Sequence, residues 1–501
     1  MLQRIAKFLS RFCADHSGVT AIIFGILLVP LLLGIGLSID YARALKTKQN
    51  LGQAIDAAAL AVGSWADLNT AQIKQKAQEY FNANYSAANL GTPSPLSVNV
   101  LNGKISISAT STVDTTFMHL AGVSQMTVDA FTEVTLNEKK IEFVMVLDNT
   151  GSMGWNGKLD ALKSAANALV DALMVDDVNA AVNEDVKIGL VPFAAAVNIG
   201  ADKLNSGWID TTAQSSVASE DFQPGTNVLD LYSQIMNRNW NGCVRARIAP
   251  FDTQDTPPTG GNTLWAPYLA PDEPDFYNYS NRYASDDGYG GSQYDYDARQ
   301  RYTGKYQTLT IPASWSDGPD FNCRTAPVTP LTPIRGDVED AINEMVATGN
   351  TVIPAGLAWG WRLVSPSPPF SEGVAYEDDD MIKAMVLLTD GQNMVSGGMG
   401  THNRSQYSAY GFAQSGHLGN TNGSEAEDVL DAKTAELCTN IKAQGIQLYT
   451  ITFQVSSTST QDLMRNCATE PGMYYDSPSN DVLIDVFQEI AKGLSDLRIS
   501  K

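Results

Sequence analysis

Histidine and cysteine are scarce in this sequence, with 4 and 5 among its 501 residues. No CxxC pair and no histidine cluster is present. A zinc site is therefore not expected, because zinc is held by such sets of thiolates and imidazoles. Basic residues are also few, since 33 Lys and Arg face 55 Asp and Glu, for a net charge of −22. A negative surface repels phosphate backbones, so we expect no nucleic-acid partner. It suits cation binding or simple solubility.

Signatures of common enzymes are missing as well. The sequence contains no GxxxxGK[ST] phosphate loop, no HExxH and no GxSxG. A metal-dependent hydrolase is the enzymatic alternative, but it needs a base beside the metal. The histidines lie outside the polar motifs described below: His16, His119, His402 and His417. We therefore expect a binding protein and not an enzyme.

One long apolar run stands near the N-terminus. Residues 19–39 read VTAIIFGILLVPLLLGIGLSI and carry no charge. Roughly 20 apolar residues cross a bilayer as a helix, whereas the apolar part of a cleaved signal peptide has roughly 7–15. Pro30 would kink such a helix, which membrane helices tolerate. We predict one transmembrane helix at 19–39, preceded by a cytoplasmic N-terminus at 1–18.

The cysteines are divided by this run. Cys13 precedes it, and four cysteines follow it. An even set beyond a membrane segment fits two disulfides in an oxidising compartment, with four buried free thiols as the alternative. We predict Cys243–Cys323, which brackets an irregular region. We also predict Cys438–Cys467, with one cysteine on a helix and the other in the loop after the following strand. This distribution places the bulk of the chain in the periplasm or at the cell surface.

The region after the membrane run predicts a helix followed by a small sheet. Residues 40–66 are rich in good helix formers and can continue the transmembrane helix. Asn102-Gly103 is a strong signal for a two-residue hairpin. Ile105 and Ile107 then alternate with serines, as in a half-buried strand, and Thr127 to Thr135 supply another strand. Together these features predict a small pilin-like α+β region over 40–140.

A family resemblance covers about the first 60 residues. GVTAIIFGILLVPLLLGIGLSIDYARALKTKQNLGQAIDAAALA is similar to the N-terminal region of TadE/TadG-like proteins, which belong to the bacterial Flp (Tad) pilus assembly system. The resemblance implies a protein of the bacterial inner membrane with a role in that system. Prepilin peptidase substrates carry a Glu five positions after a Gly. Here Gly18 is followed by Val19 to Ile23 with no Glu, so we expect a retained anchor.

From residue 141 the pattern changes to alternating strands and helices. Continuous apolar runs such as IEFVMVL and QLYTITF are typical of strands buried on both faces. Between them lie segments of helical periodicity such as KLDALKSAANALVDAL. This alternation predicts an α/β domain over 141–501, with a mostly parallel sheet and helices on both faces. Inserts at 201–333 and 394–425 interrupt it. The first is dense in Tyr, Gly and Asp, and is either a binding surface or a mobile decoration.

Polar side chains follow two of these strands directly. Asp148, Thr150 and Ser152 come after the first strand, and Asp390 comes after another. Ligands of open α/β sheets bind at the carboxyl ends of the strands, so we expect these groups to meet at one edge. Carboxylates and hydroxyls are oxygen ligands that suit a hard divalent cation.

Three segments resemble the von Willebrand factor A (VWA) family. DNTGSM matches its DxSxS motif with Thr150 in place of the first Ser, GNTVIPAGLAWGWRL matches the loop with its metal-site Thr351, and LLTDGQN carries its second Asp, Asp390. The resemblance implies a Rossmann-like VWA domain with a metal-ion-dependent adhesion site. Its ligands would be Asp148, Thr150, Ser152, Thr351 and Asp390, and its ion Mg²⁺ or another divalent cation such as Mn²⁺ or Ca²⁺.

The two resemblances together imply a membrane-anchored, metal-dependent adhesion or assembly module of a Flp pilus system. Its protein partners would be pilus-assembly or envelope components that offer a carboxylate to the metal. The alternative is an envelope scaffold or a surface adhesin not tied to pili. In that case the metal would be purely structural, since metal binding can itself stabilise a fold.

Overall fold

The computed structural model describes residues 17–63, 70–85, 91–101, 104–135, 139–174, 185–276, 278–313, 316–395, 400–419 and 423–499. The chain divides into two compact units, which we call the N-terminal unit (residues 1–138 with 499–501) and the sheet domain (residues 139–498). Of the segment expected to be cytoplasmic, residues 1–16 lie outside the described part.

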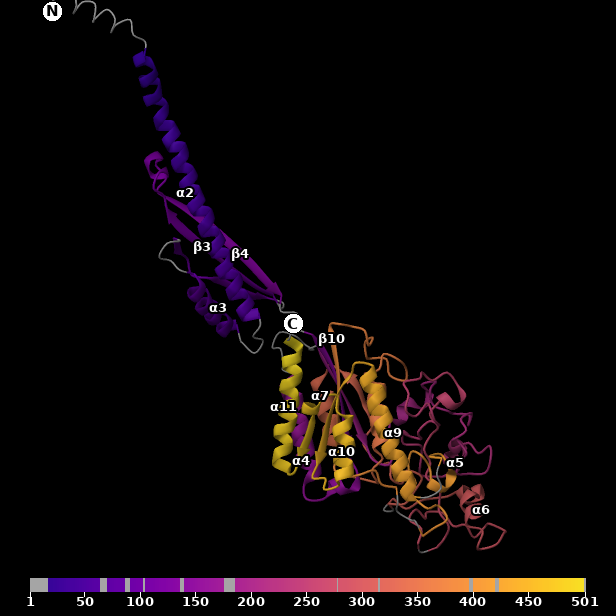
Figure 1. Cartoon of the computed structure of the whole chain (residues 1–501). Helices are drawn as coiled ribbons and strands as arrows, with labels where there is room; N and C mark the ends of the chain where they lie inside the picture. The colour runs from indigo at the N-terminus through magenta and orange to yellow at the C-terminus, as the bar shows by residue number, and fades with distance from the viewer. Residues whose placement is uncertain are drawn as a thin grey trace, which may run out of the picture. The chain divides into compact units, whose positions relative to one another are not determined.

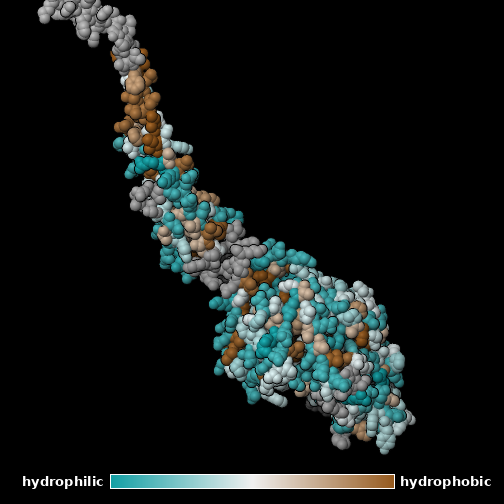
Figure 2. Space-filling view, viewed as in Figure 1, coloured by the Kyte–Doolittle hydropathy of each residue, from teal (hydrophilic) through white to brown (hydrophobic). Residues whose placement is uncertain are grey.

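The N-terminal unit is built on one continuous helix, α2 (Ser17–Gly63), so the apolar run and the stretch after it form a single element as expected. Within the described residues, α2 is the one helix long and apolar enough to cross a membrane. Most of its described large apolar side chains between Ile22 and Ile39 are exposed. They form the brown part of this helix in Figure 2. Pro30 lies inside the helix without ending it.

The second half of α2 packs on a helix and a four-stranded antiparallel sheet. The elements are α3 (Thr70–Asn84), β1 (Thr92–Pro93), β2 (Ser97–Leu101), β3 (Lys104–Asp114) and β4 (Gln125–Thr135). Ile105 and Ile107 are buried against α2 while their serine neighbours are not, which confirms the predicted alternation. Asn102 and Gly103 lie outside the described residues, although the pairing of Leu101 with Lys104 joins β2 and β3 at that point. The sequence did not reveal α3.

The sheet domain contains eight strands in the order β12-β11-β10-β5-β6-β7-β8, with β9 also paired to β6. The strands from β12 to β6 are parallel, and β7, β8 and β9 are antiparallel additions. Their bounds are β5 (Lys140–Asp148), β6 (Val186–Phe193), β7 (Val197–Asn198), β8 (Cys243–Val244), β9 (Thr329–Thr332), β10 (Met381–Thr389), β11 (Gln447–Phe453) and β12 (Tyr474–Ser477).

Helices cover both faces of this sheet (Figure 1). Successive residues of β5 face opposite sides, so Phe143 and Met145 belong to one core and Val144 and Val146 to the other. One face carries α4 (Lys158–Leu173), α7 (Arg335–Glu344) and α11 (Asn480–Ile499). The other carries α8 (Ile353–Val364), α9 (Gly423–Ala443) and α10 (Thr458–Cys467).

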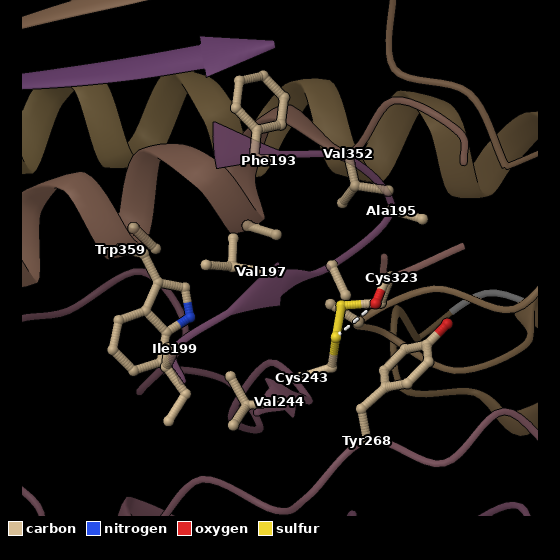
Figure 3. Packing of buried hydrophobic residues seen from close by; sticks show 14 of the residues in the cluster. Phe193, Ala195, Val197, Ile199, Cys243, Val244, Tyr268, Cys323, Val352 and Trp359 are labelled. Atoms are coloured by element: carbon tan, nitrogen blue, oxygen red, sulfur yellow. Dashed lines mark hydrogen bonds between the residues drawn. A yellow bond between two sulfur atoms is a disulfide. The ribbon is translucent and has the colours of Figure 1, made fainter. Parts of the chain in front are cut away.

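The insert at 201–333 packs into the sheet domain. Trp265, Tyr268 and Tyr306 are fully buried and belong to the same hydrophobic core as the sheet. Figure 3 shows Tyr268 in this core. Its strands β8 and β9 extend that sheet. Its remaining elements are short: η4 (Ala201–Asn205), α5 (Val228–Gln234), η5 (Gly261–Thr263), α6 (Tyr296–Arg301) and η6 (Thr303–Tyr306).

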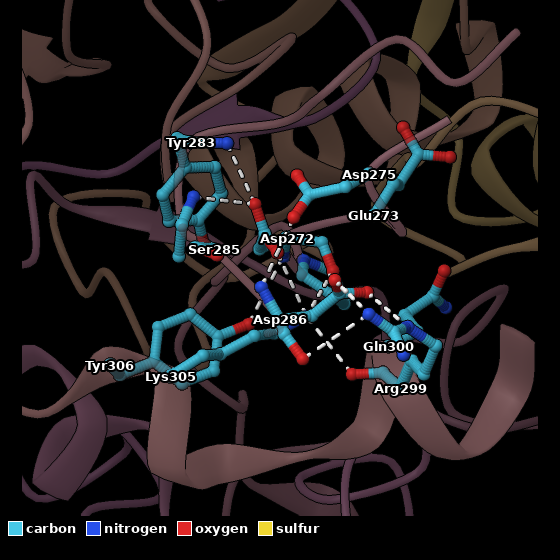
Figure 4. A network of polar contacts seen from close by, with 12 residues as sticks. Asp272, Glu273, Asp275, Tyr283, Ser285, Asp286, Arg299, Gln300, Lys305 and Tyr306 are labelled. Atoms are coloured by element: carbon cyan, nitrogen blue, oxygen red, sulfur yellow. Dashed lines mark hydrogen bonds and ion pairs between the residues drawn. The ribbon is translucent and has the colours of Figure 1, made fainter. Parts of the chain in front are cut away.

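Buried ion pairs organise the Tyr- and Asp-rich part of this insert (Figure 4). The ammonium of Lys305 lies 2.9 Å from the carboxylate of Asp272, and both side chains are fully buried. The guanidinium of Arg299 binds both oxygens of Asp286, at 2.5 and 2.8 Å. Buried polar groups need such partners. A stretch with few apolar residues is therefore ordered mainly by polar contacts.

Both predicted disulfides are present. Cys243 and Cys323, with Cα atoms 6.3 Å apart, tie β8 to the far end of the insert (Figure 3). Cys438 of α9 is bonded to Cys467, with Cα atoms 5.1 Å apart. Cys467 is the last residue of α10 and does not lie in a loop as expected. This helix has ten residues, and one of the three on its buried face, Thr460, is polar, so apolar residues alone did not mark it.

Candidate metal centre

The two predicted carboxylates lie side by side at the carboxyl edge of the sheet. Asp148 is the last residue of β5, and Asp390 follows the last residue of β10. These strands are hydrogen-bonded neighbours, with Leu147 paired to Leu388. Asp148 is fully buried and Asp390 nearly so. The expectation that these groups meet at one edge is confirmed by this geometry.

The two predicted hydroxyls reach the same point. The backbone N–H of Thr150 donates to Asp148 Oδ1 at 2.8 Å, which closes a tight turn after β5. The short helix η3 (Gly151–Gly154) then carries Ser152, whose hydroxyl donates to Asp390 Oδ1 at 2.6 Å. Thr150 Oγ1 lies 3.0 Å from Ser152 Oγ and 3.4 Å from Asp390 Oδ1. Four of the five predicted ligands are thus joined by hydrogen bonds in one connected set.

The fifth predicted ligand, Thr351, lines the same cleft. This cleft has a volume of about 570 Å³, and Thr150, Ser152, Thr351 and Asp390 all contribute to its wall. Met394, at the start of the second insert, lines it too, and its N–H donates to the carbonyl of Thr351 at 2.8 Å. The second insert therefore begins at the rim of the site.

The loop that carries Thr351 is braced by both inserts. Asn350 donates to the side-chain oxygen of Gln406, in the second insert, at 2.9 Å. Asn322, in the first insert, donates to the same oxygen at 3.2 Å. Gly349 has a φ of +66°, and a Cβ there would lie 2.6 Å from the carbonyl oxygen of Asn322. A side chain at position 349 would push the first insert away from this loop.

The electrostatics of the site favour a cation. Burial and the neighbouring charge of Asp390 raise the pKa of Asp148 to about 7. Thr389 Oγ1 donates to Asp148 Oδ2 at 2.8 Å and supports the ionised form. The ammonium of Lys158 lies 2.8 Å from Asp390 Oδ2. When Asp148 is ionised, the two carboxylates beside one ammonium carry an excess of negative charge that a bound ion would balance.

Lys158, Thr389 and Trp155 were missed by sequence reasoning. Lys158 is the first residue of α4, where the helix dipole disfavours a cation, and a lysine there signals a nearby anion. Thr389 is adjacent to Asp390 and its hydroxyl had no evident role. Trp155 lines the cleft with its side chain 70% exposed, and no motif marked it.

The donors present fit a hard divalent ion. They comprise two carboxylates and three hydroxyls, with no thiol or imidazole among the residues that line the cleft. Such all-oxygen sets suit Mg²⁺, Mn²⁺ or Ca²⁺. His402 and His417 lie elsewhere, against Tyr279 and Arg245 respectively.

A second acidic group lies in the first insert. Carboxylate oxygens of Asp275, Asp286 and Asp287 lie within 4.8 Å of one another. The carboxylate of Asp286 is already bound by the guanidinium of Arg299. This group is therefore part of an ion-pair network.

Comparison with known proteins identifies the N-terminal segment. Residues 18–67 match the family model "Tad: Putative Flp pilus-assembly TadE/G-like". No curated protein matches the chain. The match covers the apolar run and the helix that continues from it, which is the region expected from the sequence.

Solved structures similar to this chain include pilus proteins of low sequence identity. The pilus adhesin SpaC from Lactobacillus rhamnosus GG is 12% identical, with a TM-score of 0.34 over 80% of this chain and 34% of its own. The vWF domain of the type V pili tip protein Mfa5 from Porphyromonas gingivalis is 9% identical, with a TM-score of 0.35 over 73% of this chain and 97% of its own. This chain thus spans about a third of the length of SpaC. At its N-terminus the chain carries a TadE/G-like Flp pilus-assembly region, followed by an α/β sheet domain.

Proposed function

We propose that this protein is a membrane-anchored, metal-dependent adhesion or assembly module of a bacterial Flp (Tad) pilus system. It binds protein partners through a VWA-type metal-ion-dependent adhesion site. The observation that carries the proposal is the hydrogen-bonded set of Asp148, Thr150, Ser152 and Asp390, of which Thr150, Ser152 and Asp390 line an open cleft together with Thr351. The TadE/G-like match of residues 18–67 supports the pilus context.

Each residue has a distinct part in this proposal. Thr150, Ser152 and Thr351 offer hydroxyl oxygens to the ion, and Asp148 and Asp390 hold it directly or through water. Thr389 fixes the orientation of the Asp148 carboxylate by its 2.8 Å hydrogen bond. When bound, the ion supplies a positive centre that a carboxylate of a partner protein can ligate. The chemistry is binding and not catalysis.

We also propose the location. The helix α2 anchors the protein in the bacterial inner membrane, with the sheet domain in the periplasm or exposed at the surface. The disulfides Cys243–Cys323 and Cys438–Cys467 support an oxidising compartment for that domain. The partners are then pilus-assembly or other envelope proteins that present an acidic side chain.

The test is capture of partners by the full-length protein from bacterial membranes, in Mg²⁺ and in chelator. We expect envelope proteins to be retained in Mg²⁺ and lost in chelator. Thr351→Ala should abolish the capture without lowering the unfolding temperature. Thr348→Ala is the matched control, because Thr348 lies in the same loop but does not line the cleft.

A structural metal is the competing function. It is favoured by the full burial of Asp148 and by its hydrogen bonds to Thr150 and Thr389, which link β5 to β10. If Thr351→Ala and metal removal lower stability but leave partner capture intact, the site belongs to a scaffold.

A further inference from the structure

The connection between β3 and β4 is docked on α2 at the end of the apolar run. This connection, residues 115–124, reads TTFMHLAGVS and contains the short helix η2 (Met118–Ala121). Asp40 of α2 accepts hydrogen bonds from the backbone N–H groups of Phe117 and Met118, both at 2.7 Å. The N–H of Thr116 donates to the same carboxylate at 3.1 Å. Asp40 is 2% exposed, so the carboxylate is enclosed by the connection it holds.

The connection also reaches the apolar part of α2. Phe117 lies directly against Gly36, where any added Cβ would collide with its side chain. The other end of the sheet lies further along the helix, because Val134 of β4 approaches Gly63. The strands therefore run alongside α2, and the β3–β4 connection is their end nearest the membrane. Figure 1 shows the sheet lying along this helix.

The depth of this contact follows from helix geometry. Gly36 lies three residues before Ile39, the last residue of the apolar run, which corresponds to about 4.5 Å along the helix axis. Interfacial elements bury apolar side chains about 5–10 Å into the boundary between headgroups and acyl chains. A segment in contact with Gly36 is thus at the depth of the lipid interface if α2 crosses the bilayer over 19–39.

The side chains of the connection suit that position. Leu120 is 77% exposed, Val123 40% and Phe117 37%. The ten residues contain no Asp, Glu, Lys or Arg, although the chain as a whole has a net charge of −22. Single exposed apolar residues are common on protein surfaces. Three of them on one uncharged tip, beside the end of an apolar helix, are better explained by contact with lipid.

We propose that the β3–β4 connection is a second membrane contact, in which Phe117, Leu120 and Val123 enter the leaflet at the C-terminal end of the transmembrane run. This inference rests on α2 crossing the membrane. It is independent of the metal site. With two contacts, the N-terminal unit is fixed in both tilt and rotation relative to the bilayer, because a single helix leaves rotation about its own axis free.

The test places a spin label at single cysteines in the full-length protein, reconstituted in vesicles of phosphatidylcholine and phosphatidylglycerol. Cys13 is first replaced by Ser, and the four other cysteines are in disulfides. One label, at Phe24→Cys, reports on the span, and a second, at Leu120→Cys, reports on the connection. A third label, at Phe131→Cys, is the control. Phe131 is 66% exposed on β4. It lies about 20 Å along the strand from the start of β4 at Gln125.

We expect the label at position 120 to collide with oxygen and to lose its collisions with a water-soluble nickel complex, as the label at position 24 does. The label at position 131 should remain accessible to nickel. Equal nickel access at positions 120 and 131, with position 24 protected, overturns the second contact but leaves the anchor intact. Nickel access at position 24 overturns the span itself. The label at position 120 could also be protected in vesicles but accessible to nickel in nanodiscs that hold one protein copy. In that case the connection contacts a second copy of the protein, and the lipid contact is overturned.

Discussion

The hydroxyl of Ser152 donates a hydrogen bond of 2.6 Å to Asp390, a residue 238 positions further along the chain. The two side chains meet because β5 and β10 are neighbours and end at the same edge of the sheet. A divalent ion at this point would draw both oxygens to itself in place of their hydrogen bond. We therefore expect the loss of a hydroxyl at this position to have the largest effect on binding of the ion.

We predict that Ser152→Ala weakens Mg²⁺ binding at least tenfold, which corresponds to about 1.4 kcal/mol. The variant removes one oxygen ligand without adding bulk. Isothermal calorimetry on the purified full-length protein measures the effect. Ser456→Ala is the matched control, since Ser456 lines the same cleft and no hydrogen bond of the carboxylates involves it. Equal losses in both variants would argue against a ligand role for Ser152.

Lys158→Met should have the opposite effect. The ammonium of Lys158 lies 2.8 Å from Asp390 Oδ2 and repels any cation bound by the same carboxylate. We therefore expect severalfold tighter binding of Mg²⁺ in the same calorimetric assay. Lys163→Met serves as the control, because Lys163 is on the same helix but bonds to the carbonyl of Asn343. Unchanged or weaker binding in Lys158→Met would mean that the lysine positions Asp390 for the ion.

A buried ion pair in the centre of the sheet gives a prediction for stability. Glu142 of β5 is fully buried, and its register partner on β10 is Lys383, whose ammonium lies 2.5 Å away. Removing one partner of such a pair typically costs about 3–5 kcal/mol, whereas replacing both by apolar groups is often neutral. We expect Glu142→Leu to lower the free energy of unfolding by about that amount. Adding Lys383→Leu should restore most of it.

Urea denaturation followed by tryptophan fluorescence is the measurement. Of the eight tryptophans, Trp65 alone lies in the N-terminal unit, so the signal reports mainly on the sheet domain. A double variant as unstable as Glu142→Leu would show that the loss comes from packing and not from an unpaired ammonium.

Acid should destabilise the sheet domain through His417. Burial, and then the charge of Arg245, lower the pKa of this histidine to about 3. Its Nε2–H donates to the carbonyl of Arg247 at 3.2 Å, and Lys433 adds a further positive charge nearby. Below about pH 6.5 the unfolded chain takes up a proton at His417 that the folded chain does not. Stability contributed by the neutral ring is therefore lost as pH falls, by up to about 1.4 kcal/mol per pH unit.

The unfolding free energy of His417→Gln, compared with wild type between pH 7 and pH 5, isolates this effect. The comparison is needed because Glu220 faces the same ring, and burial raises its pKa to about 7. Protonation of Glu220 stabilises the fold over part of the same range. His119→Gln, at an exposed position, is the control. Parallel pH profiles for wild type and His417→Gln would refute the assignment.

Most of the parallel sheet was predictable because its strands are apolar on both faces. The runs IEFVMVL and QLYTITF agree with β5 and β11 within one residue at each end. The helix α8 was missed for the same physical reason, since all twelve of its residues are buried and leave no polar stripe to reveal a period. The strands β8 and β9 were missed because two to four residues carry too little pattern.

The candidate site was predictable to the level of its ligands but not of their partners. Asp148 and Asp390 follow apolar runs, so strand topology alone brings them together. Thr351 follows no strand and was found through family resemblance. Trp155 lies in the turn after η3, where Asn156 and Gly157 adopt positive φ, and Lys158 begins α4 directly after this turn. Backbone turns of this kind redirect side chains in ways that periodicity does not encode.

Asn322 and Gln406 support the Thr351 loop, and this support determines whether the two inserts can be treated as separate modules. Segments 201–333 and 394–425 interrupt the α/β pattern. They would therefore be the first segments to be exchanged or deleted in a search for the smallest domain that holds the site. Their contacts with Asn350 and Gly349 make them supports of the loop that closes the cleft. A chimera assembled from the α/β pattern alone would keep the motifs and lose the scaffolding that holds one of them in place. Transferring the candidate metal site to another protein would require the domain as one piece.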